Sequence, residues 1–125
     1  MNENQIGKAI LGCAIKVHTV LGPGLLESAY EACLAKELDN AGLAYQRQLI
    51  LPIVYEGLKI DAGYRLDLLV QNLVVVEVKA IDKLIDIHRA QLLSYLKLGG
   101  YRLGYLLNFN VTKMRDGMVR LVNGL

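Results

Sequence analysis

Two strand-like runs decide the fold: Tyr64-Arg65-Leu66-Asp67-Leu68-Leu69-Val70 and, after a short connection, Val74-Val75-Val76-Glu77-Val78-Lys79-Ala80. Both are short, apolar and rich in branched residues, which predicts neighbouring strands in the core of a sheet. Because alternate side chains of a strand point to one face, Glu77 and Lys79 share a face about 7 Å apart. The valines between them take the other face. The sequence therefore places charged side chains inside a sheet core.

The connection between the runs determines whether Asp67 and Glu77 meet. They face each other only if the register of the two strands pairs positions whose residue numbers add up to 144. A slip of one residue in this register would move every side chain of one strand to the opposite face of the sheet. A three-residue loop, Gln71-Asn72-Leu73, gives this register, and Asn72 is the residue expected to have a positive φ. A two-residue loop without a bulge would separate the carboxylates and exclude a shared site.

Charges in a sheet core need compensation, since an unpaired buried charge tends to neutralise itself by a pKa shift. One arrangement is a divalent cation held by Asp67 and Glu77 with Lys79 beside it, which would also make a reaction site. The other is a structural ion pair between Lys79 and Glu77 or Asp67. These two runs alone leave both arrangements open.

The rest of the chain surrounds the two runs with helices and further strands. Its 125 residues suit one domain, residues 1–125, that buries a core without disulfides. The connection from 74–80 through a helix to 103–109 predicts a right-handed crossover, and the whole order predicts an α/β sandwich around a mixed sheet. Apolar periodicity, glycines and prolines predict helices over about 6–21, 25–41 and 84–98. Further strand-like runs are expected over 48–55, where Pro52 marks an edge or bulge, and over 58–60, 103–109 and 118–122.

Composition excludes several classes of protein. The chain is 54% hydrophobic, yet no apolar run is long enough to span a membrane, and the first residues lack the pattern of a secretory signal, so we expect a cytoplasmic protein with no membrane contact. Cys13 and Cys33 lack zinc-site spacing and are expected to be core residues. The net charge of +2 divides into −2 over 1–44 and +4 over 45–125, which permits a polyanionic partner without requiring one.

An acid, a hairpin and then Glu-x-Lys on a central strand resemble the signature of the PD-(D/E)XK nuclease-like superfamily. The similarity extends through most of the chain and implies a restriction-endonuclease-like three-layer sandwich, an α/β fold whose mixed central sheet is flanked by helices. Leu106 to Phe109 and Asp116 to Arg120 are also similar to its GxxExxY family. The name-giving motif of that family is matched by Gly24-Leu25-Leu26-Glu27-Ser28-Ala29-Tyr30, and Gln91-Leu92-Leu93-Ser94-Tyr95 resembles the QxxxY element of RecB-like nucleases.

The resemblance implies a role for each matching residue. Asp67, Glu77, Lys79 and Glu27 would be catalytic, and the three acids would be ligands of Mg²⁺ or Mn²⁺. Leu66 stands where the superfamily name has a proline, a variation that the superfamily tolerates. For Glu27, in the first turn of its helix, a favourable interaction with the helix N-terminus is the alternative to a metal role.

Gln91, two tyrosines and the two histidines are further candidates for functional or structural roles. The resemblance implies that Gln91 and Tyr95 contact a phosphate or base of the substrate, although a polar helix edge is the alternative. Tyr30 is expected to pack in the core with its hydroxyl as an anchor. For His18 and His88 we favour structural roles; RecB-like nucleases can use a histidine of the first helix as a ligand, which keeps His18 as a candidate.

Three functions remain open. The first is a metal-dependent nuclease that hydrolyses phosphodiester bonds in DNA or RNA, and the second is a non-catalytic accessory module that binds nucleic acid or protein. The third, a hydrolase of smaller phosphoesters, would need a closed pocket. Because a fold of this size offers little surface to a duplex, a homodimer or a partner protein would complete the first function.

Overall fold

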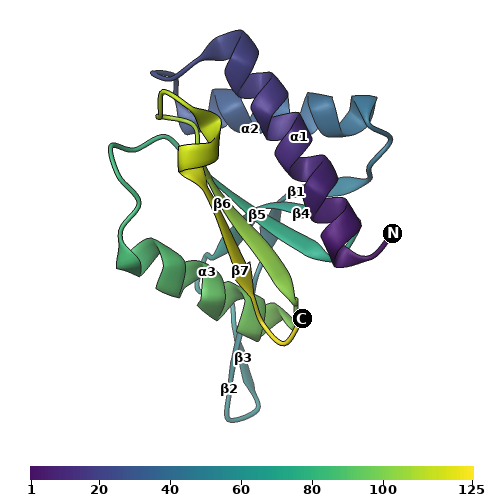
Figure 1. Ribbon diagram of the computed structural model, residues 1–125. Coiled ribbons are helices and arrows are strands. Elements are labelled where there is room, and N and C mark those ends of the chain that lie inside the picture. Colours follow the sequence, from purple (N-terminus) through teal and green to yellow (C-terminus); the bar gives the residue numbers. More distant parts are fainter.

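The computed structural model describes all residues, 1–125, as three α-helices, seven strands and a 3₁₀ turn (Figure 1). Two helices come first, five strands follow in succession, and α3 then separates β5 from β6. Along the chain the elements are α1 (Glu3–Leu21), α2 (Glu27–Asn40), β1 (Tyr45–Ile50), β2 (Ile53–Tyr55), β3 (Leu58–Ile60), β4 (Arg65–Val70), β5 (Val74–Lys79), α3 (Asp86–Gly99), β6 (Leu103–Asn108), η1 (Met114–Gly117) and β7 (Met118–Val122).

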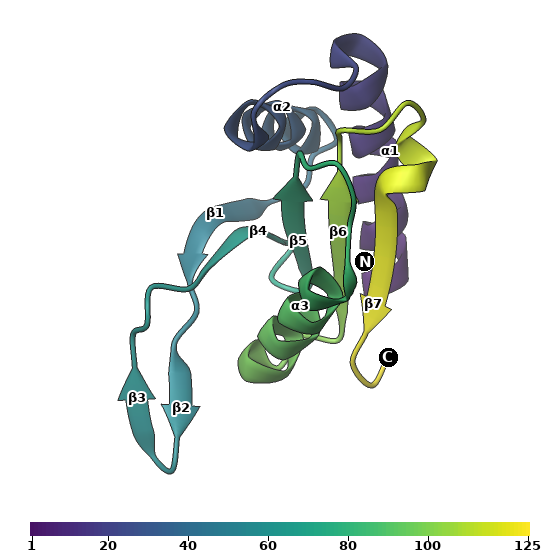
Figure 2. The same ribbon diagram turned by 90° about the vertical axis from the view of Figure 1, so that its left-hand side faces the viewer.

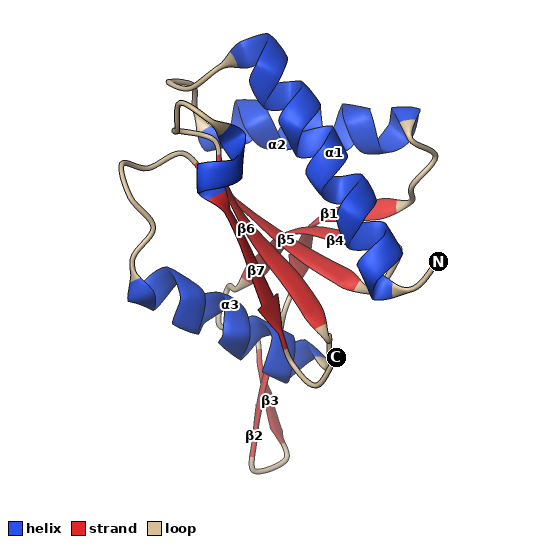
Figure 3. Cartoon of the chain, viewed as in Figure 1, coloured by secondary structure: helices blue, strands red, loops and turns tan.

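Five strands form the central sheet, in the order β1-β4-β5-β6-β7 (Figure 3). Only β5 and β6 run parallel, joined through α3, and the other neighbours are antiparallel. The predicted strand–helix–strand crossover is therefore present. β5, which carries Glu77 and Lys79, lies in the middle of the sheet.

Helices cover both faces of the sheet (Figure 2). α1 and α2 pack on one face, where the valines at 74, 76 and 78 join the larger core. α3 packs on the other face, where Leu92 and Leu96 meet Val75 and Leu106. The fold is thus the restriction-endonuclease-like sandwich that the sequence predicted, and Glu77 and Lys79 belong to the α3 face because they alternate with the valines of the larger core.

The register between β4 and β5 is the predicted one. Leu68 pairs with Val76 and Val70 with Val74, so the paired numbers add up to 144. Asn72 has a φ of 58°, as expected, and Gln71 also has a positive φ, of 54°. The loop closes because the Leu73 N–H donates to the Val70 carbonyl at 3.0 Å. The local turn therefore brings both carboxylates to one face.

The strand-like run predicted over residues 48–55 is divided into two strands at Pro52, the residue expected to mark an edge or bulge, and the chain leaves the central sheet there. β1 ends at Ile50, and Pro52, which has no N–H to donate, stands between β1 and β2. β2 and β3 then pair only with each other and project from the body as a separate hairpin (Figure 2). Val54, Tyr55 and Leu58 on this hairpin are 61%, 64% and 62% exposed.

Cys13 is buried in the larger core and Cys33 packs at its edge, and both are free thiols. This agrees with their expected role as small core residues. No helix of the protein combines the length and the apolar character needed to cross a membrane.

Candidate active site

Asp67 and Glu77 are fastened to each other's strand at the point where the backbone pairing of β4 and β5 ends. Asp67 Oδ2 accepts a hydrogen bond from the Val78 N–H at 2.8 Å, and Glu77 Oε1 accepts one from the Asp67 N–H at 3.3 Å. Beyond the Leu68–Val76 pair, side-chain carboxylates thus replace carbonyls as acceptors. These two bonds hold the carboxyl groups of Asp67 and Glu77 between β4 and β5, and we call them the Asp67/Glu77 pair.

The electrostatics of this pair are unfavourable for two negative charges. Glu77 is only 6% exposed, and burial, followed by the nearby charge of Asp67, raises its pKa from 4.5 to about 9. The positive charge of Lys79 lowers that pKa, but it does not outweigh the other two effects. Glu77 therefore keeps its proton at neutral pH unless a further positive charge approaches.

Lys79 is half-buried on the same face and forms none of the ion pairs in the structure. Its influence on the pKa of Glu77 shows that the ammonium lies within electrostatic reach of the pair. A structural ion pair between Lys79 and Glu77 or Asp67 was the alternative to a reaction site, and the structure does not contain it. The ammonium group is therefore free to meet a substrate.

Glu27 reaches the same end of β5 from another element. It is the first residue of α2, and its Oε2 accepts a hydrogen bond from the Ala80 N–H at 3.2 Å. Lys79 is the residue immediately before this contact. The carboxylate thus fastens the start of α2 to the end of β5.

Tyr30 explains how the chain holds Glu27 in place. Its side chain is fully buried, and its ring stacks on Phe109 with centroids 4.6 Å apart. The Tyr30 hydroxyl donates to the Gly22 carbonyl at 2.6 Å and accepts from the Leu25 N–H at 3.1 Å. The expected combination of core packing and hydroxyl anchor is confirmed, and it fixes the loop that leads into Glu27.

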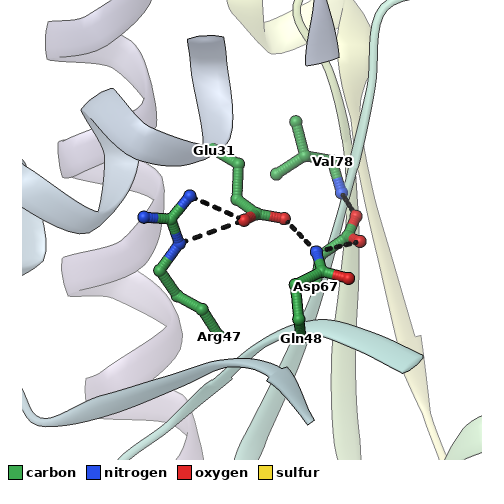
Figure 4. A network of polar contacts seen from close by, with 5 residues as sticks. All are labelled: Glu31, Arg47, Gln48, Asp67 and Val78. Atoms are coloured by element: carbon green, nitrogen blue, oxygen red, sulfur yellow. Dashed lines mark hydrogen bonds and ion pairs between the residues drawn. The ribbon is translucent and has the colours of Figure 1, made fainter. Parts of the chain in front are cut away.

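A polar network that the sequence did not predict connects Asp67 to the buried Glu31 of α2 (Figure 4). Glu31, only 7% exposed, accepts from Arg47 Nε and Nη2 at 3.0 and 2.9 Å and from Gln48 Nε2 at 2.7 Å. The same Gln48 Nε2 donates to Asp67 Oδ1 at 3.3 Å. This chain of contacts joins α2, β1 and β4, so the position of Asp67 depends on a charged pair on two other elements.

Gln48 adopts a left-handed backbone conformation, with a φ of 53°, within β1. A residue other than glycine seldom takes this conformation, because its Cβ crowds the backbone. Arg47 pairs with Leu68 and Leu49 with Leu66, so Gln48 lies opposite Asp67 in the register. One signal in the sequence pointed to this network, namely the position of Glu31 one helical turn after Glu27.

The three side chains of α3 that the sequence analysis considered, His88, Gln91 and Tyr95, have different surroundings. Tyr95 is buried, and its pKa is raised by burial first and then by the negative charge of Glu77. Gln91 is exposed, and its side chain makes no hydrogen bond within the protein. His88 Nδ1 accepts from the Ile85 N–H at 3.0 Å at the start of α3. His18 Nε2 lies 2.7 Å from the Val111 carbonyl, far along the chain from the carboxylates. Both histidines thus contact backbone, as their structural interpretation requires.

The donor atoms at the pair suit a hard divalent cation. Carboxylate oxygens are the preferred ligands of Mg²⁺ and Mn²⁺, and a cation would remove the unfavourable charge of an ionised Glu77. No group of three or more His, Cys, Asp or Glu side chains is gathered as a metal cage, since Glu27 points to Ala80. The pair would supply two protein ligands to such a cation and would leave other positions to water and substrate.

Comparison with known proteins gives one match. No curated protein and no solved structure matches the chain. A sequence model of the PD-(D/E)XK nuclease superfamily matches residues 4–121, which include every residue of the site described above. Nucleases of this superfamily generally use divalent metals. With the acid, the hairpin, the Glu-x-Lys strand and this match in agreement, the chain belongs to the PD-(D/E)XK nuclease superfamily.

Proposed function

We propose that this protein is a metal-dependent nuclease that hydrolyses phosphodiester bonds in DNA or RNA at the Asp67/Glu77 pair. The observation that carries the proposal is the buried Glu77 carboxyl, whose pKa is raised to about 9 beside Asp67. Such a pair is costly to keep in a core without a function, whereas a divalent cation would compensate it. Membership in the nuclease superfamily supports the same conclusion.

Each residue of the site has a distinct task in this proposal. Asp67 and Glu77 hold Mg²⁺ or Mn²⁺, which would supply charge neutralisation at the scissile phosphate and an acidified water. The Val78 carbonyl offers a further oxygen ligand, and Glu27 a third carboxylate at the end of β5. Lys79 orients the attacking water or stabilises the developing negative charge through its compact ammonium group.

Two finer assignments belong to the same proposal. The Gly24–Glu27–Tyr30 spacing favours the GxxExxY branch of the superfamily. Gln91 and Tyr95 bind the substrate, and their support is that Tyr95 lies within electrostatic reach of Glu77 while the Gln91 amide is unpaired and exposed. The protein would then recognise the nucleic acid from α3 and cleave it from β4 and β5.

The experiment is cleavage of end-labelled single-stranded DNA, duplex DNA and RNA in Mg²⁺ or Mn²⁺. Wild type is compared with Lys79→Ala and with Lys36→Ala, which removes an exposed lysine of α2 outside the site. We expect metal-dependent cleavage that is lost in Lys79→Ala, retained in Lys36→Ala and absent in EDTA. Because Lys79 forms no ion pair, the inactive variant should melt within a few degrees of wild type.

The competing function is an accessory module on the same fold. The observation that favours it is the projecting β2–β3 hairpin, whose exposed Val54, Tyr55 and Leu58 offer an apolar surface to a partner protein or a second copy. No cleavage of any substrate, together with measurable Mn²⁺ binding, would favour this function over the nuclease. Equilibrium sedimentation of wild type would then show whether the hairpin joins two copies.

A further inference from the structure

A hollow of about 460 Å³ lies between the base of the β2–β3 hairpin, the segment before β4 and α3. Its apolar wall comes from Ile53 at the base of the hairpin and from Ile87 and Leu98 on α3. Tyr64 and Tyr95 complete the wall. A hollow of this size with mainly apolar walls is typical of a binding site for a small planar group.

The two tyrosines give the hollow an aromatic surface. Their ring centroids are 5.8 Å apart and the rings are tilted by 56°. Tyr95 is 7% exposed and anchored in the core of the α3 face, whereas Tyr64 is 39% exposed and comes from the irregular segment before β4. Tyr64 thus offers a ring face to the solvent, and Tyr95 supports it.

Polar groups line the rim of the same hollow. His88, Gln91 and Ser94 all belong to α3, and the latter two are exposed. The Gln91 amide offers both donors and an acceptor, and the Ser94 hydroxyl offers both as well. His88 uses Nδ1 as an acceptor from the Ile85 N–H, which leaves Nε2 for an external contact. An aromatic face with donors and acceptors at its edge matches the two parts of a nucleobase.

The hollow also lies at a suitable distance from the reaction site. Tyr64 precedes Asp67 by three residues, which is about 10 Å of extended chain. One nucleotide can bridge such a gap between its phosphate and its base. Tyr95 lines the hollow and belongs to the same core cluster as Leu66, the residue before Asp67.

We propose that this hollow, which we call the Tyr64–Tyr95 pocket, receives one unpaired nucleobase of a single-stranded nucleic acid, next to the phosphate at the Asp67/Glu77 pair. The inference rests on the proposed nuclease function and adds the substrate class. A base within a duplex is paired and stacked, so it enters only after extrusion at a cost of a few kcal/mol. The pocket therefore selects single strands, or duplexes with an unpaired base.

The test uses a single strand with 2-aminopurine at successive positions, because stacking on an aromatic ring quenches the fluorescence of this base. All variants carry Lys79→Ala to prevent cleavage, and binding is measured in Mg²⁺. Stacking of a base on an aromatic side chain contributes about 1–3 kcal/mol, so Tyr64→Ala should weaken binding about 5- to 150-fold and abolish the quenching. Tyr64→Phe should retain both.

Two controls make the result specific. Tyr55→Ala removes a tyrosine that is 64% exposed near the tip of the hairpin and outside the pocket, and it should change neither affinity nor quenching. A strand with an abasic position in place of the quenched base should bind the protein that retains Tyr64 weakly. Its affinity should equal that of the intact strand for the Tyr64→Ala protein. In Tyr64→Ala, the abasic position should then cost nothing further.

The outcomes separate this inference from the function on which it rests. Quenching and affinity that survive Tyr64→Ala would overturn the proposed nucleobase pocket. The proposed nuclease function would still stand if the cleavage experiment showed metal-dependent activity that is lost in Lys79→Ala. Equal affinity for a perfect duplex and a single strand would also overturn the pocket. If no strand binds and none is cleaved, both proposals are wrong.

Discussion

Replacing Glu77 with glutamine should make the metal-free protein more stable at neutral and alkaline pH. In the folded protein this carboxyl holds its proton to about pH 9, whereas its ordinary pKa, and that of the unfolded chain, is 4.5. Folding therefore takes up a proton at any pH between these values. The contribution of Glu77 to stability is fully present below about pH 4.5 and is lost as the pH rises to about 9.

The magnitude follows from this window. Each pH unit inside it costs about 1.4 kcal/mol, so wild type should lose at most about 4 kcal/mol between pH 5 and pH 8 through this group. Glutamine has nearly the same shape and no proton to release, so that loss should disappear. The size of the loss makes Glu77 a major term in the stability of a domain that is marginally stable overall.

The assay is urea denaturation of wild type and Glu77→Gln in EDTA at several pH values from 5 to 8.5. Because other groups titrate too, the quantity to follow is the difference in unfolding free energy between the two proteins. It should rise with pH in favour of Glu77→Gln. Glu56→Gln, at the exposed tip of the β2–β3 hairpin, is the matched control and should give a constant difference.

Adding metal should reverse the order of stability. A cation that binds only the folded protein stabilises it by about 2.7 kcal/mol at a hundredfold excess over its dissociation constant. Wild type should gain this in Mn²⁺ and release the Glu77 proton, whereas Glu77→Gln should gain much less. A free-energy difference that stays flat from pH 5 to pH 8.5 would refute the reasoning, since Glu77 would then be ionised and compensated by the protein alone.

Two further predictions concern the residues that hold the site. Gln48→Gly should keep the fold, because glycine accepts a φ of 53°. It should weaken Mn²⁺ affinity about 10- to 100-fold, because Asp67 loses its amide partner. A Mn²⁺ titration followed by electron paramagnetic resonance checks this, and an unchanged affinity would contradict it. Asn108→Ala should lower the free energy of unfolding, measured by urea denaturation, by about 2–3 kcal/mol. The Asn108 side chain is buried, accepts from the Ile81 N–H at 3.1 Å and donates to the Ile81 carbonyl at 3.0 Å. A loss below 1 kcal/mol would show that water replaces these bonds.

The core of the site could be predicted because its geometry is local in the sequence. Asp67 and Glu77 are ten residues apart, and the loop between them sets the register. Strand periodicity then places Lys79 on the same face as Glu77. Short-range rules of this kind depend on backbone sterics and hydrogen bonding, so they hold before any other part of the protein is packed.

The prediction was incomplete where a local pattern met a tertiary constraint. Residues 48–55 look like one strand, but β1 must stop at the edge of β4, and the chain then leaves the sheet at Pro52. Gln48 takes a left-handed conformation that its residue type does not suggest. Pro52 marks the interruption in the sequence, but local propensity predicts neither the separate β2–β3 hairpin nor the conformation of Gln48.

The sequence by itself determined the class of fold, the shared face of Asp67, Glu77 and Lys79, and the nuclease family. Only the tertiary structure decided what surrounds them: the support of Asp67 by Glu31 through Gln48, the contact of Glu27 with Ala80, and the meeting of Tyr64 with Tyr95. These contacts join residues between 17 and 53 positions apart in the hydrogen-bonded cases. Periodicity fixes which way a side chain points on its own element, whereas the packing of helices against the sheet decides which side chain it meets.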